Sequence, residues 1–341
     1  MKRFRRVIWC LAVVVSVAGL AACARGNAAQ VQRPNPSTVT LYAVPTADAA
    51  GLYVAYDKGF FRDQGLNVKI VPTKGGEDTL GVLKSGKADF VEGNYVSFIQ
   101  FQAAHQLNLR IIADSSLMQA GNQALYVMPN SPYRTVSDLA NAHATIGVNT
   151  LHNIGQVLIG SALQSAGKSL NDVHLTAPST GFPGELAELK SGQISAAWLP
   201  EPFGTMAQQQ LGARMLTDLD QGGLQNFPIG CVLGDQKWIQ GHPATVAAFL
   251  RAYKQGQLVA DTNRTAVQAS LEKHTGVPPL IADTMTLDNY PLYMDISEMQ
   301  RVPDVMFNAR AMNAGYSYKA PYQISTMIQP EPGMVRRNPG G

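Results

Sequence analysis

The feature that most constrains the fold is a segment that occurs twice, with Lys84 and Lys190 106 residues apart. Residues 75–86 (GGEDTLGVLKSG) precede an apolar run, and so do residues 181–192 (GFPGELAELKSG). Each copy predicts a short helix with apolar i, i+3 spacing that is closed by a glycine. Chance recurrence of four common residues is the alternative. The shared order of glycine, helix, glycine and strand favours a duplication.

The segments upstream of the two copies also correspond in kind. The patterns predict strands at 39–42 and 68–71 around a helix at 49–57, and strands at 144–148 and 173–177 around a helix at 155–165. Each half is then β-α-β-α-β, in which right-handed helical crossovers make the strands parallel. Two such units predict a two-lobed α/β protein.

The rest of the chain does not repeat this pattern. We expect a long helix at 244–259 and the helices after it to pack back on the first lobe. The predicted organisation is a signal peptide (1–22), a tether (23–37), the first part of lobe 1 (38–125), lobe 2 (126–228), a return to lobe 1 with C-terminal helices (229–328) and a flexible tail (329–341).

The first residues have the parts of an export signal. A basic start precedes an apolar run from Val7 to Ala22, which is shorter than the ~20 residues of a membrane-spanning helix. The exit, Leu-Ala-Ala-Cys, matches the bacterial lipobox, which implies cleavage before Cys23 and lipidation of its thiol. An uncleaved membrane helix is the alternative. We expect an exported protein that is lipid-anchored on the outer face of the cytoplasmic membrane, or on the periplasmic side of a membrane.

Charge and cysteine content exclude several classes. Residues 1–22 contain four of the 27 basic side chains and no acidic one, so the remainder is close to neutral, with 23 basic and 24 acidic side chains. No basic cluster indicates nucleic-acid binding. Beyond Cys23 only Cys231 remains, which predicts a small buried apolar residue rather than a disulfide.

Ligands of open parallel sheets bind beyond the carboxyl ends of the strands. The candidate loops are 45–51, 73–79 and 92–95 in the first half and 149–155, 179–184 and 199–202 in the second. In the loop 149–155, Asn149, His152, Asn153 and Gly155 are binding candidates because the loop leads into a helix N-terminus, which favours an acceptor oxygen or an anion. Simple helix capping is the alternative.

The other candidate binding residues also have purely structural explanations. Gly75 and Gly76 allow close approach of a ligand to the backbone, or only a tight turn. Tyr95 and Trp198 are placed to clamp a flat ligand, although most aromatic residues belong to the core. Glu201 is placed to accept a hydrogen bond from an amine or hydroxyl, or is a solvated hinge residue.

Catalytic motifs are missing. The six histidines are scattered without metal-ligand spacing, and no G-x-S-x-G, P-loop or G-x-G-x-x-G follows a predicted strand. A cleft without such chemistry indicates a binding protein that is not an enzyme, with no cofactor and no metal.

Several blocks resemble a known family. Residues 55–68 (AYDKGFFRDQGLNV) resemble the KGFF-x-x-x-GL-x-V signature of nitrate/sulfonate/taurine solute-binding proteins, which thiamine-pyrimidine binding proteins share. Residues 86–90 (GKADF) match G-x-AD, and residues 196–203 (AAWLPEPF) match A-x-x-x-EPF. Ser137-Asp138-Leu139 matches the DL before the second-lobe strand, but the usual KGK after it is Ala-Asn-Ala in this chain. The resemblance covers residues 41–253.

The resemblance implies a type II periplasmic-binding-protein fold. It also implies a monomeric receptor of an ABC importer, docking on a membrane permease with a small-molecule ligand between closing lobes. The implied ligands are small anionic or polar solutes such as sulfonates, taurine or nitrate, with an aminopyrimidine as the alternative. A pyrimidine-synthase-like enzyme is disfavoured because its cysteine motif is absent, and a sensor lipoprotein stays open. Carried over by position, the family's binding contacts fall on Ala49, Gly76, Asn94, Asn149, Asn153, Phe182, Trp198 and Glu201.

Overall fold

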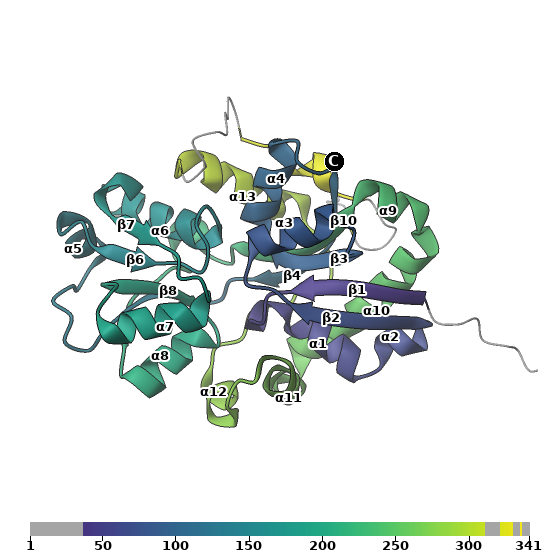
Figure 1. Cartoon of the computed structure of the whole chain (residues 1–341), viewed down its shortest axis with the longest axis horizontal. Coiled ribbons are helices and arrows are strands. Elements are labelled where there is room, and N and C mark those ends of the chain that lie inside the picture. The colour runs from purple at the N-terminus through teal and green to yellow at the C-terminus, as the bar shows by residue number, and fades with distance from the viewer. Residues whose placement is uncertain (1–36, 311–320, 330–334, 336–341) are drawn as a thin grey trace, which may run out of the picture. The chain divides into compact units, whose positions relative to one another are not determined.

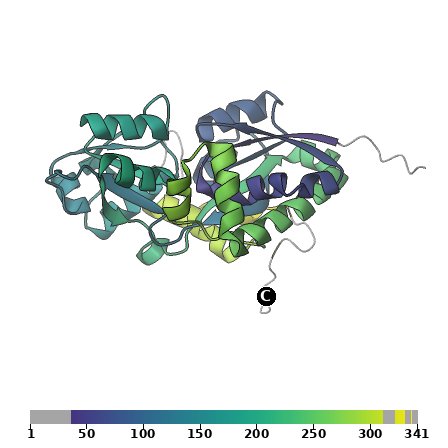
Figure 2. The ribbon, with the colours of Figure 1, turned by 90° about the horizontal axis from the view of Figure 1, so that it is seen from below.

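The computed structural model describes residues 37–310, 321–329 and 335. Cys23, the signal segment and most of the tail therefore lie outside the described residues. The described part contains two five-stranded mixed sheets with helices on both faces of each, shown in Figure 1 and from below in Figure 2. Within that part, no helix has the length and apolar character needed to cross a membrane.

The first sheet has the strand order β2-β1-β3-β10-β4. β1 pairs in parallel with β2 and β3, whereas β10 pairs antiparallel with β3 and β4. Alternate residues of β1 form the core, with Val39, Leu41 and Ala43 fully buried. The strands are β1 (Ser37–Ala43), β2 (Leu66–Pro72), β3 (Phe90–Asn94), β4 (Leu109–Leu117) and β10 (Pro228–Asp235).

The second sheet has the equivalent order, β7-β6-β8-β5-β9. β6 pairs in parallel with β7 and β8, and β5 pairs antiparallel with β8 and β9. The predicted parallel β-α-β-α-β unit is thus confirmed in both halves. The antiparallel strands in each sheet were not predicted. The strands are β5 (Gln123–Val127), β6 (Thr145–Gly147), β7 (His174–Thr176), β8 (Ala196–Pro200) and β9 (Arg214–Asp218).

The helices of the two halves follow the same sequence of elements. The first half contains η1 (Ala47–Ala49), α1 (Ala50–Asp57), α2 (Phe60–Asp63), α3 (Gly76–Lys84) and α4 (Tyr95–Ala103). The second contains α5 (Val136–Asn141), α6 (Ile154–Ser165), η2 (Leu170–Asp172), α7 (Phe182–Ser191), α8 (Phe203–Leu211) and η3 (Gly222–Leu224). The C-terminal helices are α9 (Gln236–Gly241), α10 (Pro243–Thr262), α11 (Arg264–Thr275), α12 (Pro279–Thr284), α13 (Ile296–Asn308) and η4 (Ile324–Met327).

The repeated segments form α3 and α7, as predicted. Both are followed by a glycine in the left-handed region, Gly86 with φ 67° and Gly192 with φ 76°. A side chain with a Cβ is disfavoured in that region, which explains why both copies end in glycine.

The Lys-Gly-Phe-Phe block fixes α10 to the first sheet. Phe61 is 2% exposed and stacks on Phe249 of α10 with ring centroids 5.1 Å apart, and Phe249 lies 4.7 Å from the Phe90 ring of β3. Each buried aromatic ring contributes roughly 1.5–3 kcal/mol through burial of apolar surface. The block therefore serves packing rather than ligand contact.

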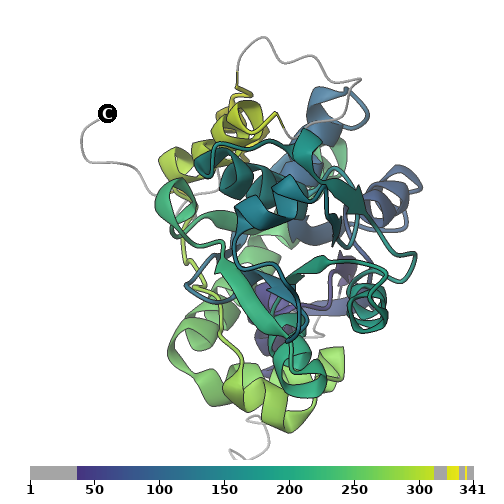
Figure 3. The ribbon, with the colours of Figure 1, turned by 90° about the vertical axis from the view of Figure 1, so that its left-hand side faces the viewer.

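The C-terminal helices do not all lie on the first half. α10 and α11 contact α1, as expected, but α12 also contacts α8 and α13 contacts α6. Figure 3 shows α11 and α12 at the bottom of the view and α13 at the top, on opposite sides of the sheets. The chain enters the second sheet between Leu117 and Gln123, ahead of the division predicted at residue 125, and returns between Asp218 and Pro228.

Candidate functional site

Two cavities lie where the parallel strands of both sheets end. They are adjacent, because Val44 and Phe182 line both. The smaller has a volume of about 30 Å³ and the larger about 540 Å³. We call them the inner pocket and the outer pocket. The inner pocket is lined by Val44, Thr46, Asp48, Glu92, Gly93, Asn94, Gln123, Asn149, Asn153, Ile154, Phe182, Trp198, Pro200, Ile229 and Gly230.

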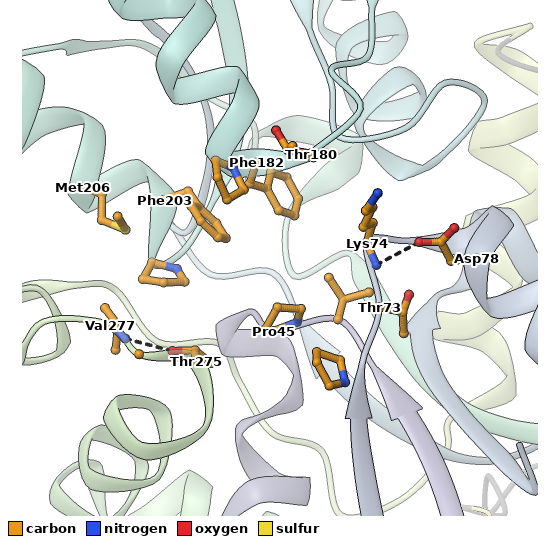
Figure 4. Close-up of a pocket in the computed structure, with 16 residues that line it drawn as sticks. Pro45, Thr73, Lys74, Asp78, Thr180, Phe182, Phe203, Met206, Thr275 and Val277 are labelled. Atoms are coloured by element: carbon orange, nitrogen blue, oxygen red, sulfur yellow. Dashed lines mark hydrogen bonds between the residues drawn. The ribbon is translucent and has the colours of Figure 1, made fainter.

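The outer pocket is mainly apolar. Figure 4 shows Phe182 and Phe203 of α7 and α8 on one side, and Pro45 and Thr73, from the loops after β1 and β2, on the other. The two phenyl rings stack with centroids 4.8 Å apart. Lys74 also lines this pocket, and its backbone N–H donates to the Asp78 carboxylate at 3.3 Å.

The inner pocket is lined by two carboxyl groups from the first half, of which Asp48 is half-buried and Glu92 is buried. Asp48, on η1 after β1, accepts a hydrogen bond from the Thr46 hydroxyl at 2.7 Å. Glu92, on β3, accepts one from the Ser115 hydroxyl of β4 at 2.9 Å. Glu92 is 1% exposed. Gly230 of β10 makes this packing possible, because a Cβ there would lie 2.3 Å from the Ser115 Oγ.

A third carboxyl group lies beside these two. Asp288, in the loop after α12, is 6% exposed and accepts from the Asn122 side-chain amide at 2.6 Å. Asp48 and Asp288 also share a hydrogen bond between their side chains. Two carboxyl groups bond in this way only when one of them holds a proton.

Burial raises the pKa of all three groups. Burial, with the charge of Asp48, raises the pKa of Glu92 to about 8, an effect that the Ser115 hydrogen bond offsets only in part. Burial also raises the pKa of Asp48, and burial with the charge of Asp48 raises that of Asp288 well above its usual range. The charged forms are disfavoured because burial among protein atoms reduces their hydration. Among the described residues, none of the three takes part in an ion pair.

Several polar atoms of the inner pocket have no hydrogen-bond partner among the described residues. They are Glu92 Oε2, Gln123 Oε1 and Trp198 Nε1, on side chains that are only 1–2% exposed. Buried polar atoms are nearly always paired in folded proteins, since each unpaired one costs roughly 1–3 kcal/mol. Three such atoms lining one cavity indicate a site built for a polar ligand.

Direct contacts join the two halves across this site. The Asn149 side-chain amide donates to the Lys74 carbonyl at 3.1 Å, and the Gln100 amide donates to the His152 carbonyl at 2.7 Å. The Ala47 backbone N–H donates to the Glu201 carbonyl at 3.0 Å. The ligand loops of the two sheets therefore close over the inner pocket.

The structure brings together five of the residues predicted from sequence. Asn94, Asn149, Asn153, Phe182 and Trp198 all line the inner pocket. The side chains of Asn94 and Asn153 also cap α4 and α6, accepting from Ser97 and Gly155. The loops that line the inner pocket therefore also cap these helices.

The other predicted residues line neither pocket. The Tyr95 hydroxyl bonds to Asp114 inside the core, and Tyr95 is fully buried. Ala49 is buried on η1, and Gly75 lies against Asn149, where a Cβ would be 3.1 Å from its amide nitrogen. Gly76 begins α3.

His152, Gly155 and Glu201 have supporting positions. His152 presents its carbonyl to Gln100, and Gly155 leaves space for the Trp198 ring, which a Cβ would approach to 2.3 Å. Glu201 accepts from the Thr205 backbone N–H and hydroxyl at 3.1 and 2.8 Å, and burial raises its pKa to about 7.

Sequence reasoning missed the acidic residues. Asp48 and Glu92 lie in the loops 45–51 and 92–95 that were predicted to face the ligand, but neither was selected. Gln123 and Asp288 reach the site from segments that carry no local signal. The described residues contain no group of three or more His, Cys, Asp or Glu arranged to hold a metal ion. Cys231 is fully buried, as predicted.

Two sheets of equivalent order with a cavity lined from both define a two-sheet α/β fold. The model of the NMT1/THI5-like family matches residues 46–263, and the chain belongs to that family. No curated protein matches the sequence significantly.

Solved structures share the fold at low identity. The alkanesulfonate-binding protein SsuA from Xanthomonas axonopodis pv. citri has a TM-score of 0.71 at 16% identity, covering 86% of this chain and 99% of its own. The nitrate-binding protein NrtA from Synechocystis PCC 6803 has a TM-score of 0.63 at 17% identity, covering 72% and 68%. The desulfurization enzyme DSZB has a TM-score of 0.65 at 16% identity, covering 86% and 97%. The predicted periplasmic-binding-protein fold is confirmed.

Proposed function

We propose that this protein is the solute-binding receptor of an ABC importer, which captures a small polar organic molecule between its two sheets. One observation carries this proposal: the inner pocket is lined from both sheets, and its buried polar atoms lack partners. Such a cavity, closed by loops from two halves, is the arrangement by which a receptor encloses a ligand. The alkanesulfonate- and nitrate-binding neighbours support the same class of function.

The ligand contacts in this proposal are Asn94, Asn149, Asn153, Phe182 and Trp198. Phe182 and Trp198 offer aromatic surface, with ring centroids 5.7 Å apart. The three amides offer both donors and acceptors for a polar group. Hydrogen bonds such as Asn149 to Lys74 would hold the closed arrangement once a ligand is enclosed.

The proposal places the protein outside the cytoplasm. Cleavage before Cys23 and lipidation of its thiol would tether it beside a membrane permease, its partner, as a monomer. Replacing Cys23 with Ala should release the protein from the membrane fraction. Retention of that variant in membranes would contradict the anchor.

Binding without catalysis is part of the proposal, although the DSZB neighbour has the same fold. Fold alone does not determine activity, which depends on the site. The free thiol of Cys231 is buried, and burial raises its pKa well above the usual range, so this cysteine is unsuited to act as a nucleophile.

The test is to identify and then remove the ligand. Mass spectrometry of natively purified protein should detect a bound small molecule. Its return to unfolded and refolded protein should raise the melting temperature, because a ligand that binds only the native state stabilises it. Asn153→Ala should weaken the effect, whereas Asn141→Ala, at an exposed position of α5, should not. Turnover of the ligand into a product would contradict a pure receptor.

A further inference from the structure

The inner pocket is lined by acidic side chains and by no basic one. Asp48 and Glu92 line it and Asp288 lies against Asp48, whereas none of its lining residues is Lys, Arg or His. Burying carboxyl groups together without a cation is unfavourable, because each loses its hydration and repels the others when charged. A fold that retains them here has a use for negative charge in the cavity.

The unpartnered atoms supply a second, independent observation. Gln123 Oε1 is an unpaired acceptor, and Glu92 Oε2 is an unpaired carboxylate oxygen, both lining the cavity. Each is on a side chain 1% exposed. A group that enters this pocket can donate hydrogen bonds to both of these oxygens, while the third unpartnered atom, Trp198 Nε1, is itself a donor.

The small volume of the inner pocket narrows the class of ligand further. The volume of about 30 Å³ exceeds the roughly 10–15 Å³ that a cavity needs to hold one water molecule, so the inner pocket admits a compact polar group. An ammonium group is compact, carries three donors and is positively charged. The adjoining outer pocket, with Phe182 and Phe203, offers apolar surface to the rest of the molecule.

We propose that the captured solute is an organic amine whose protonated nitrogen enters the inner pocket and is held by Asp48 and Glu92. This inference rests on the proposed receptor function and names its ligand class. The Gln123 carbonyl would take a further N–H. Simple anions such as nitrate lack the donors that these oxygens require.

A buried acid outside the pocket provides a matched control. Glu185 of α7 is fully buried, both its carboxyl oxygens lack partners among the described residues, and burial raises its pKa well above the usual range. It lines neither cavity. Glu185→Gln therefore reproduces the removal of a buried acid without touching the proposed amine site.

The experiment uses the mature protein with three probes of similar shape: benzylamine, benzyl alcohol and benzenesulfonate. Benzylamine should raise the melting temperature more than the other two. Glu92→Gln and Asp48→Asn should each weaken benzylamine binding by about tenfold or more, and Glu185→Gln should leave it unchanged. Two separate acid variants keep the test valid if one of them does not fold.

Calorimetry gives a second readout. Binding of a cation should favour the ionised form of Glu92, so proton release into the buffer should accompany binding near neutral pH, and Glu92→Gln should reduce it. Binding of benzenesulfonate or benzyl alcohol as tightly as benzylamine would overturn the amine inference and leave the receptor function standing. If no probe binds and native protein carries no ligand, both proposals fail.

Discussion

The two halves of this protein have the same order of elements but opposite chemistry at the ligand site. The 106-residue offset places Glu92 of the first half opposite Trp198 of the second, and Asp48 opposite Ile154. All four line the inner pocket. At these equivalent positions the first half has carboxyl groups where the second has an aromatic or aliphatic side chain, although the second half also contributes the polar Gln123, Asn149 and Asn153. Equivalent backbone positions in the two sheets therefore carry different side chains at the strand ends.

The same offset relates Ala49 to Gly155 and Ala43 to Asn149. The glycine is needed only where the bulky Trp198 packs over the helix N-terminus, and the asparagine only where the second half reaches across to Lys74. These paired differences can be tested one by one.

The largest effect should be the change in the free energy of unfolding with pH. In the unfolded chain Glu92 ionises near pH 4.5, but in the native protein it keeps its proton to about pH 8. Between these values the native state binds more protons than the unfolded state, so the free energy of unfolding should fall as pH rises, by at most about 5 kcal/mol for this group. The stability of Glu92→Gln should decline less steeply over the same interval.

Urea unfolding at several pH values measures this difference. The ionisable groups that interact with Glu92 are Asp48, Tyr53, Cys231, Tyr253 and Asp288, all shared by the wild type and the variant. The comparison therefore isolates Glu92. Parallel pH profiles of the two proteins would show that Glu92 is charged in the folded state.

The next effect concerns the glycine under Trp198. In Gly155→Ala the new Cβ would lie 2.3 Å from the Trp198 Cε3 atom, so the ring or α6 must shift. Overpacking of this kind destabilises a protein by roughly 1–3 kcal/mol. A lower melting temperature is expected, together with a shifted tryptophan emission spectrum. An unchanged melting temperature would mean that the indole is free to move.

A smaller loss should follow when Asn149 is made like its counterpart, Ala43. Asn149→Ala removes the hydrogen bond to the Lys74 carbonyl and one to Asn153. A loss of about 1 kcal/mol in the free energy of unfolding is expected. Small-angle scattering should show a more open protein. Asn141→Ala, which removes only a bond to the exposed Lys168, is the control.

The smallest effect should be a gain in stability. Gly81 of α3 corresponds to Ala187 of α7, and a Cβ at Gly81 would meet nothing within 4 Å. Gly81→Ala should therefore stabilise α3 by about 0.5–1 kcal/mol, because alanine loses less backbone freedom on folding. Chemical denaturation detects a change of this size. A destabilised variant would indicate that the two repeat helices differ in their surroundings.

Much of the fold followed from local patterns. The parallel strands and their crossover helices were predicted because hydrophobic periodicity and glycine caps act over neighbouring residues. The strands β4, β5, β9 and β10 were missed, because a strand's partners and direction depend on segments far away in the sequence, such as β10 beside β3.

The residues of the candidate site were likewise predicted only in part. The loops that face the ligand, and residues such as Asn94, Asn149 and Trp198, were selected because the carboxyl ends of parallel strands meet at one edge. A glutamate in the run Phe-Val-Glu-Gly-Asn, however, has nothing local to distinguish it from a solvated side chain.

By itself, the sequence determined the family blocks, the duplicated β-α-β-α-β order and the loops at which a ligand is expected. Only the tertiary structure decided that these loops enclose an acidic pocket. The physical reason is that the pKa of a carboxyl group depends on what packs over it. Ser115, Gly230 and Asp288 come from other strands and a distant loop, and together they bury Glu92 and pack against Asp48.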